Sequence, residues 1–144
     1  MKSKFVVGYD GSDASRRALD FAIERAKLQG GSVLIAHVLE WSPYSFLTPT
    51  ELEERHKRRT EELARAKSAL MDPIVKSVSD RGVEIETEIR YGNIADTICS
   101  IAEKAGAAQI MIGRNGEGGL AARVFGSVAG SLAQNAPVPC TIVP

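Results

Sequence analysis

The segment Ser32-Val33-Leu34-Ile35-Ala36-His37-Val38-Leu39 is an almost uninterrupted apolar run. A strand with one face in water alternates apolar and polar residues, whereas a continuous run is typical of a strand covered on both faces. Strands of this kind belong to parallel sheets, whose crossover helices lie on both sides. The run therefore predicts a buried strand of a parallel sheet.

The residues before this run have the pattern of a strand, a turn and a helix. Lys4 to Tyr9 are β-rich and apolar, and the turn Asp10-Gly11-Ser12 follows them. Apolar residues then recur at helical spacing from Ala14 to Ala26, with Ser12 as a candidate N-cap. Gly30-Gly31 supplies the left-handed residue that commonly ends a helix.

A long charged helix is predicted after the aromatic loop Glu40 to Pro49. Thr50 to Glu53 has the spacing of a capping box, and the helical pattern continues to Lys76. Pro73 predicts a kink or a break, because proline lacks an amide donor and clashes with the carbonyl four residues earlier. The residues expected to form its buried stripe are Leu52, Leu63, Ala66, Leu70, Ile74 and Val75.

The second half of the chain continues the alternation of strands and helices. Residues 83–90 alternate apolar and polar side chains, which predicts an edge strand. The remaining elements are a helix capped by Asn93 and ending near Gly106, a strand at 109–112, a helix at 127–134 and a strand at 140–143. The fold class is therefore α/β: a single doubly wound, five-stranded parallel sheet with helices on both faces, Rossmann-like, with strand order 3-2-1-4-5. We expect residues 1–144 to form a single domain.

Composition restricts the partners of the chain. Eighteen basic and eighteen acidic side chains among 144 residues give a formal net charge of zero, so no overall field favours nucleic acid or an anionic membrane. No segment approaches the roughly 18 apolar residues of a membrane span, and we expect a cytoplasmic protein. Cys99 and Cys140 form no CxxC pair and are expected to be buried thiols.

The glycine-rich segment from Gly113 to Ser127 is the leading candidate for a binding loop. In a doubly wound sheet ligands bind at the carboxyl ends of the strands where the strand order reverses, which would bring this loop opposite Asp10-Gly11-Ser12. Glycines let backbone amides approach a phosphate closely, and the helix start at Ser127 and Val128 adds the favourable end of a helix dipole. The alternative is that the glycines only make a mobile surface loop. The segment is not a P-loop, because no lysine precedes Ser127.

These residues resemble the universal stress protein family, in its ATP-binding branch. The resemblance rests on Val7 to Ser15, on His37-Val38, and on the motif in which Gly113-x-x-Gly116 is followed after nine residues by Gly126-Ser127. It implies that Asp10, Gly11 and Ser12 face the adenosine, that Val38 contacts the adenine through its backbone, and that Ile112 packs nearby. It further implies that Gly113 and Gly116 approach the phosphates and that Gly126, Ser127 and Val128 hold the distal ones; Arg114 is a candidate phosphate contact.

The family resemblance implies ATP with Mg²⁺ as the ligand, and a homodimer formed through the last strand, Pro139 to Val143. An apolar edge strand with few charges would otherwise be an association hazard, which independently favours pairing. ADP, AMP and cyclic AMP remain open as ligands.

We interpret the chain as a nucleotide-binding regulatory module read by an unidentified protein partner. Phosphoryl transfer usually needs a lysine and a second acidic metal ligand, and the sequence offers no such set. Asp10 is therefore expected to accept a hydrogen bond from ribose. A slow ATPase or another adenine-nucleotide hydrolase, with Asp10 as base or metal ligand, and a nucleotide-free interaction module remain the alternatives.

Overall fold

The computed structural model describes residues 3–40, 48–114 and 127–144 of the chain. Five parallel strands form one sheet in the order β3-β2-β1-β4-β5, as the sequence predicted. They are β1 (Lys4–Gly8), β2 (Ser32–Glu40), β3 (Glu84–Gly92), β4 (Gln109–Gly113) and β5 (Cys140–Val143). The continuous apolar run became β2, which lies between β1 and β3, and the alternating strand β3 lies at the edge.

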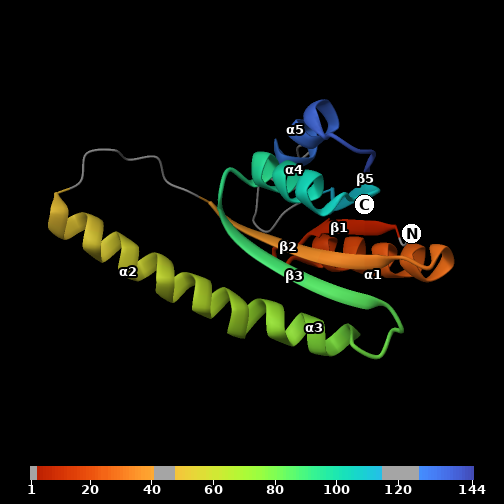
Figure 1. Ribbon diagram of the computed structural model, residues 1–144, viewed down its shortest axis with the longest axis horizontal. Helices are drawn as coiled ribbons and strands as arrows, with labels where there is room; N and C mark the ends of the chain where they lie inside the picture. Colours follow the sequence, from red (N-terminus) through yellow and green to blue (C-terminus); the bar gives the residue numbers. More distant parts are fainter. Residues whose placement is uncertain (1–2, 41–47, 115–126) are drawn as a thin grey trace.

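Helices cover both faces of this sheet (Figure 1). They are α1 (Asp13–Gln29), α2 (Pro49–Arg65), the π-helical segment η1 (Ala66–Met71), α3 (Asp72–Val78), α4 (Ile94–Ala105) and α5 (Ser127–Asn135). Figure 1 shows α4 and α5 on one side of the sheet and the continuous α2, η1 and α3 segment on the other. Within the described ranges, no helix combines the length and hydropathy needed to cross a membrane.

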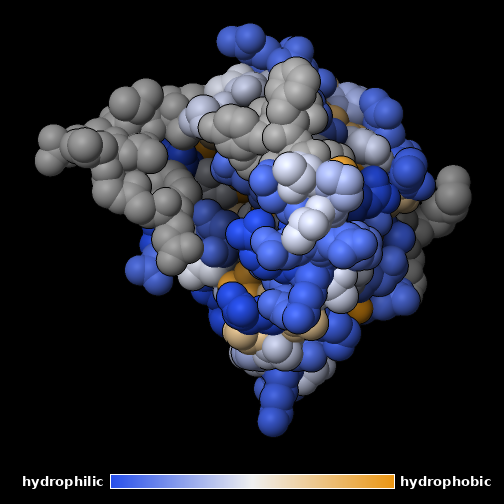
Figure 2. Space-filling model, turned by 90° about the vertical axis from the view of Figure 1, so that its left-hand side faces the viewer, coloured by the Kyte–Doolittle hydropathy of each residue, from blue (hydrophilic) through white to orange (hydrophobic). Residues whose placement is uncertain are grey.

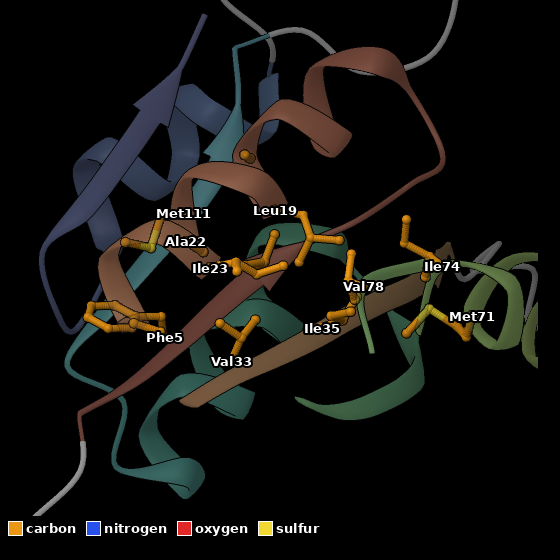
Figure 3. Close-up of a cluster of buried hydrophobic side chains, with 13 residues drawn as sticks. Phe5, Leu19, Ala22, Ile23, Val33, Ile35, Met71, Ile74, Val78 and Met111 are labelled. Atoms are coloured by element: carbon orange, nitrogen blue, oxygen red, sulfur yellow. The ribbon is translucent and has the colours of Figure 1, made fainter. Parts of the chain in front are cut away.

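Two buried apolar clusters hold these layers together. Between the sheet and the helices α1 and α3, the side chains of Phe5, Leu19, Ile23, Ile35 and Met111 interdigitate (Figure 3). The opposite face of the same strands packs against α4 and α5 in the second cluster. Alternate residues of β1 and β2 thus pack into opposite clusters, because successive side chains of a strand point to opposite faces of the sheet.

The ends of α1 and α4 follow the predicted caps. The Ser12 hydroxyl accepts a hydrogen bond from the amide of Ser15, and Gly30 ends α1 with φ = 69°. The Asn93 side chain accepts from the amide of Asp96, and Gly106 ends α4 in the same left-handed conformation. Each cap replaces a hydrogen bond that the helix end itself cannot make.

The predicted start and buried stripe of the charged helix were partly wrong. The N-cap is Thr48, whose hydroxyl accepts from the amide of Glu51, with Pro49 in the first helical turn; Thr50 lies inside the helix. None of the side chains of α2 is buried, and Leu52 is 52% exposed, because α2 extends past the ends of β2 and β3 (Figure 1). Of the predicted stripe, Ile74 is buried in the core, and Leu70 and Val75 are partly buried against it. Met71 and Val78, which were not predicted, are also buried there.

The expected break at Pro73 takes the form of a wider helical turn. The amide of Asp72 donates to the carbonyl of Lys67, five residues back, and α3 begins with Pro73 in its first turn. An α-helical path would place the proline ring against the carbonyl four residues earlier, and the wider π turn removes that clash. The helix therefore continues past the proline without interruption.

Tyr91, near the end of β3, contacts α2. Its hydroxyl donates to the Glu62 carboxylate at 2.6 Å, and the Arg59 guanidinium lies 4.6 Å from the centre of its ring. Burial, followed by the bond to Glu62, raises the pKa of Tyr91 to about 12. These contacts fix α2 beside the carboxyl end of the edge strand.

Candidate functional site

The carboxyl ends of β1 and β4 form the switch point of the sheet. The chain leaves β1 for α1 on one face and leaves β4 for α5 on the other, while β1 and β4 are paired neighbours. Connections that diverge in this way leave a crevice at the strand ends. The structure has a cavity of about 280 Å³ at this position.

Asp10 lines the cavity and is the first residue of the turn Asp10-Gly11-Ser12, which adjoins the cavity. Oδ1 of Asp10 accepts from the amide of Ser12 at 2.9 Å and also from the Ser12 hydroxyl. The Ser15 hydroxyl donates to the carbonyl of Ser12 at 2.9 Å and accepts from the amide of Asp10 at 3.3 Å. These side chains therefore close a ring of hydrogen bonds that fixes both the turn and the start of α1.

The floor of the cavity is lined by small and branched apolar residues on one face of the sheet. Gly8 is paired with Ala36 in the strand register, and Ile98 of α4 and Ile112 of β4 lie against it. A Cβ atom added to Gly8 would lie 3.0 Å from Cδ1 of Ile98 and 3.1 Å from Cγ2 of Ile112. The missing side chain of Gly8 is thus part of what keeps the recess open.

Close packing against α1 requires a glycine at position 113, apart from any contact with phosphate. A Cβ atom there would lie 2.7 Å from the carbonyl carbon of Ala14 and 2.8 Å from its Cβ. The end of β4 therefore packs directly against the first turn of α1. The next residue, Arg114, is exposed, and its amide donates to the carbonyl of Val143 at 2.8 Å.

The cavity brings together seven of the eleven residues predicted from the sequence. These are Asp10, Val38, Ile112, Gly113, Arg114, Ser127 and Val128. Gly11 and Ser12 belong to the adjoining turn and do not line the cavity. Gly116 and Gly126 lie outside the described residues, as does most of the glycine-rich segment.

Nine other lining residues were not among the predicted contacts. They are Gly8, Tyr9, Ser15, Ala36, His37, Glu40, Ile94, Ile98 and Ala129. Ala36 and Glu40 are displaced from Val38 by two residues along β2, so strand alternation was the signal that could have found them. Nothing local marks Ile98, because its place depends on how α4 packs on the sheet.

The polar groups around the cavity are unevenly distributed. Glu40 of β2 and Asp10 after β1 carry carboxylates, while Arg114 after β4 carries a guanidinium. His37 connects the first two strand ends: because a carbonyl oxygen only accepts, its Nδ1–H donates to the carbonyl of Tyr9 at 2.7 Å. The phenol of Tyr9 has a pKa raised chiefly by burial, which favours its neutral form.

Comparison with known proteins identifies the family. The model of the universal stress protein family matches residues 1–144. The chain belongs to the universal stress protein family. A universal stress protein of Methanocaldococcus jannaschii is 33% identical over 140 residues, which are 97% of this chain and 81% of that protein.

Solved universal stress protein structures share the fold. The universal stress protein UspA of Lactobacillus plantarum superposes with a TM-score of 0.82 at 24% identity, covering 99% of this chain and 97% of that one. A universal stress protein of Archaeoglobus fulgidus, solved in complex with dAMP, has a TM-score of 0.64 at 26% identity and covers 100% and 98%.

The two cysteines of this universal stress protein are half-buried rather than fully buried as expected. Both pack at the margin of the core between the sheet and α4 and α5. Burial raises the pKa of each thiol, and neighbouring negative charge adds to the effect at Cys99. Across residues 3–40, 48–114 and 127–144, no group of three or more His, Cys, Asp or Glu side chains is arranged to hold a metal ion.

Proposed function

We propose that this universal stress protein binds an adenine nucleotide, ATP with Mg²⁺, in the cavity at the ends of β1 and β4. The observation that carries the proposal is the recess floored by Gly8 and Ala36 and walled by Val38, Ile98 and Ile112. A flat apolar ring fits a slot of this kind, with polar groups at its rim fixing the orientation. A Cβ at Gly8 would narrow the recess, so the fit depends on this residue.

The charges at the rim give the nucleotide a direction. The guanidinium of Arg114 and the first turn of α5, with Ser127 and Val128, favour an anion on the β4 side. Asp10 and Glu40 disfavour an anion on the β2 side. We therefore place the phosphates beside Gly113 and Arg114, the ribose beside Asp10, and the base against Val38. The proposed phosphate contacts Gly116 and Gly126 lie outside the described residues.

The proposed ligand is supported by the dAMP complex of the Archaeoglobus fulgidus relative. ATP differs from dAMP by two further phosphates and a 2′-hydroxyl group. The glycine motif from Gly113 to Ser127 is the sequence argument for the added phosphates. Mg²⁺ would be held mainly by those phosphates and by water, since this ion is commonly bound with one or two carboxylates and no closed protein cage.

We further propose that the whole chain, residues 1–144, is one nucleotide-binding unit that acts in the cytoplasm as a regulatory module. β5 is an edge strand of the sheet, and its residues are half-buried. One side of β5 pairs with β4, and among the described residues the sheet has no further strand on the other side. Pairing of two copies through Pro139 to Val143 would satisfy that edge. Bound ATP would then stabilise a dimer state that a partner protein reads.

Calorimetric titration tests the binding proposal. We expect the parent to bind ATP with Mg²⁺, Gly8→Ala to bind more weakly, and Gly8→Val to lose binding because the branched side chain fills the recess. Arg114→Ala should weaken ATP more than adenosine, whereas Arg58→Ala, an exposed residue of α2, should change neither. If the folded parent binds no adenine nucleotide, the proposal is wrong; rapid turnover of ATP in the same samples would instead indicate a hydrolase.

A further inference from the structure

Glu40 is the last residue of a row of β2 side chains that lines the cavity from its floor to its mouth. Ala36, Val38 and Glu40 alternate along β2, so their side chains leave the same face of the sheet. Ala36 is 1% exposed and Val38 is 9% exposed, whereas Glu40 is exposed at the mouth. Glu40 also lines a second, adjoining cavity with Asn93 and Ser131, so its carboxylate stands between the two.

The surroundings of Glu40 differ from those of two other carboxylates on this face, Glu86 and Glu88. Glu86 pairs with Lys4 at 3.0 Å, and Glu88 pairs with Arg90 at 2.6 Å. The register partner of Glu40 on β3 is Gly92, which has no side chain. Within the described part of the chain, no ion pair or hydrogen bond engages the Glu40 carboxylate, so it is available to a ligand at the rim.

The direction of the nucleotide decides which of its groups Glu40 meets. This step rests on the proposed function, with phosphates on the β4 side. The ribose joins base and phosphates, so it occupies the middle position beside Asp10, and the base edge farthest from the ribose points toward the end of β2. In adenine that far edge carries the exocyclic amine, which is a hydrogen-bond donor.

We propose that Glu40 is a specificity-determining residue whose carboxylate accepts a hydrogen bond from the exocyclic amine of the bound base. A carboxylate can only accept, so a base whose far edge lacks a donor leaves this bond unmade. The same charge repels phosphates, which disfavours the reversed orientation of the nucleotide in the cavity. Glu40 thus selects both the edge chemistry of the base and its direction.

The experiment compares ATP with purine riboside triphosphate, which differs from ATP only by lacking the exocyclic amine. Dissociation constants are measured by calorimetry for the parent, Glu40→Ala and Glu84→Ala. Glu84 is an exposed control on the neighbouring strand, at the opposite end of the sheet: it is in register with Ser32, the first residue of β2. Both ligands carry the same phosphates, so any change in charge repulsion cancels in the ratio of the two constants.

We expect the parent and Glu84→Ala to bind ATP about tenfold more tightly than the analogue, and Glu40→Ala to bind the two about equally. If Glu40→Ala keeps the parent ratio, or strengthens both ligands equally, Glu40 acts at most through its charge and the proposal is overturned. If the parent binds ATP but does not distinguish the analogue, the proposal is also overturned while the proposed function stands. Failure of the parent to bind either ligand removes both.

Discussion

Gly113→Ala should unfold this protein more easily, whether or not a nucleotide is present. The new methyl group would lie 2.7 Å from the carbonyl carbon of Ala14, 2.8 Å from its Cβ and 2.9 Å from its oxygen. Carbon atoms pack best at about 3.5–4.0 Å, so these contacts are about 0.7 Å too short. All three atoms belong to the backbone or the Cβ of α1, and none can move by rotating a side chain.

The loss of stability in Gly113→Ala depends on how easily α1 can shift away from the new methyl group. Relief requires the first turn of α1 to shift, although Ala14, Ala18 and Leu19 of that helix are buried against the sheet. Overpacking of a rigid core costs about 1–3 kcal/mol, and this site belongs at the upper end. For a chain of this size, about 3 kcal/mol lowers Tm by roughly 6–12 °C.

Gly8→Ala is the matched control. Its new methyl group would meet Cδ1 of Ile98 at 3.0 Å and Cγ2 of Ile112 at 3.1 Å, which are the ends of side chains that can shift. We expect a loss below about 1 kcal/mol, because the reduced flexibility of the unfolded chain offsets part of the crowding. Thermal unfolding of the nucleotide-free proteins, followed by circular dichroism, compares the two. If Gly113→Ala melts with the parent, or Gly8→Ala melts lower than Gly113→Ala, the packing explanation is refuted.

Two further substitutions test local features of the fold. Ser12→Ala removes the N-cap of α1 and a hydrogen-bond partner in the adjoining turn, so it should lower the free energy of unfolding in urea by about 1 kcal/mol. Ser12→Asn keeps a capping side chain and should change this free energy by only a few tenths of a kcal/mol. An unchanged urea midpoint for Ser12→Ala would contradict the capping role. Tyr91 holds its proton more tightly in the folded protein, with a pKa raised from 10.0 to about 12, so its contribution to stability is complete below pH 10 and is lost as the pH rises toward 12. Ultraviolet titration of tyrosinate should show a smaller late absorbance change in Tyr91→Phe than in the parent, by the contribution of one phenol, because the pKa of Tyr9 is raised as well. Equal late changes in the two proteins would argue against the bond to Glu62.

The order of the elements could be predicted because each depends on local chemistry. The apolar run of β2, the alternation along β3, and the caps at Ser12 and Asn93 act within one strand or one helical turn. The strand order followed from these elements together with the general behaviour of parallel sheets. Local patterns and chain topology were sufficient for this part of the fold.

The charged helix shows where local patterns fail. Thr48-Pro49 and the capping box from Thr50 are competing start signals, and proline in the first turn favoured the earlier threonine. Leu52 has the spacing of a buried residue, yet it is exposed because the sheet ends before that turn of α2. Helical periodicity identifies a common face but contains no information about how far the covering layer extends.

The sequence was sufficient to predict where in the fold the site lies, but not which residues form the floor of the cavity. The turn at Asp10 and the end of β4 at Gly113 were expected to converge, and they line one cavity. Its floor depends on the register that places Gly8 beside Ala36 and on the packing of Ile98 above them. Figure 2 shows the side of the molecule at the carboxyl ends of β2 and β3. The surface there is mostly hydrophilic, with small apolar areas. The apolar recess is therefore a product of tertiary packing.

The hydrogen-bonded ring of Asp10, Ser12 and Ser15 affects the entropy of ligand binding. Ordering a loop around a ligand reduces the affinity, because the loss of conformational freedom opposes association. In this turn that freedom is already lost when α1 forms, since the Ser12 hydroxyl both caps the helix and donates a hydrogen bond to the Asp10 carboxylate. A ligand that contacts Asp10 therefore binds to a preorganised turn. The conformational entropy of this turn is lost during folding and does not reduce the free energy of binding.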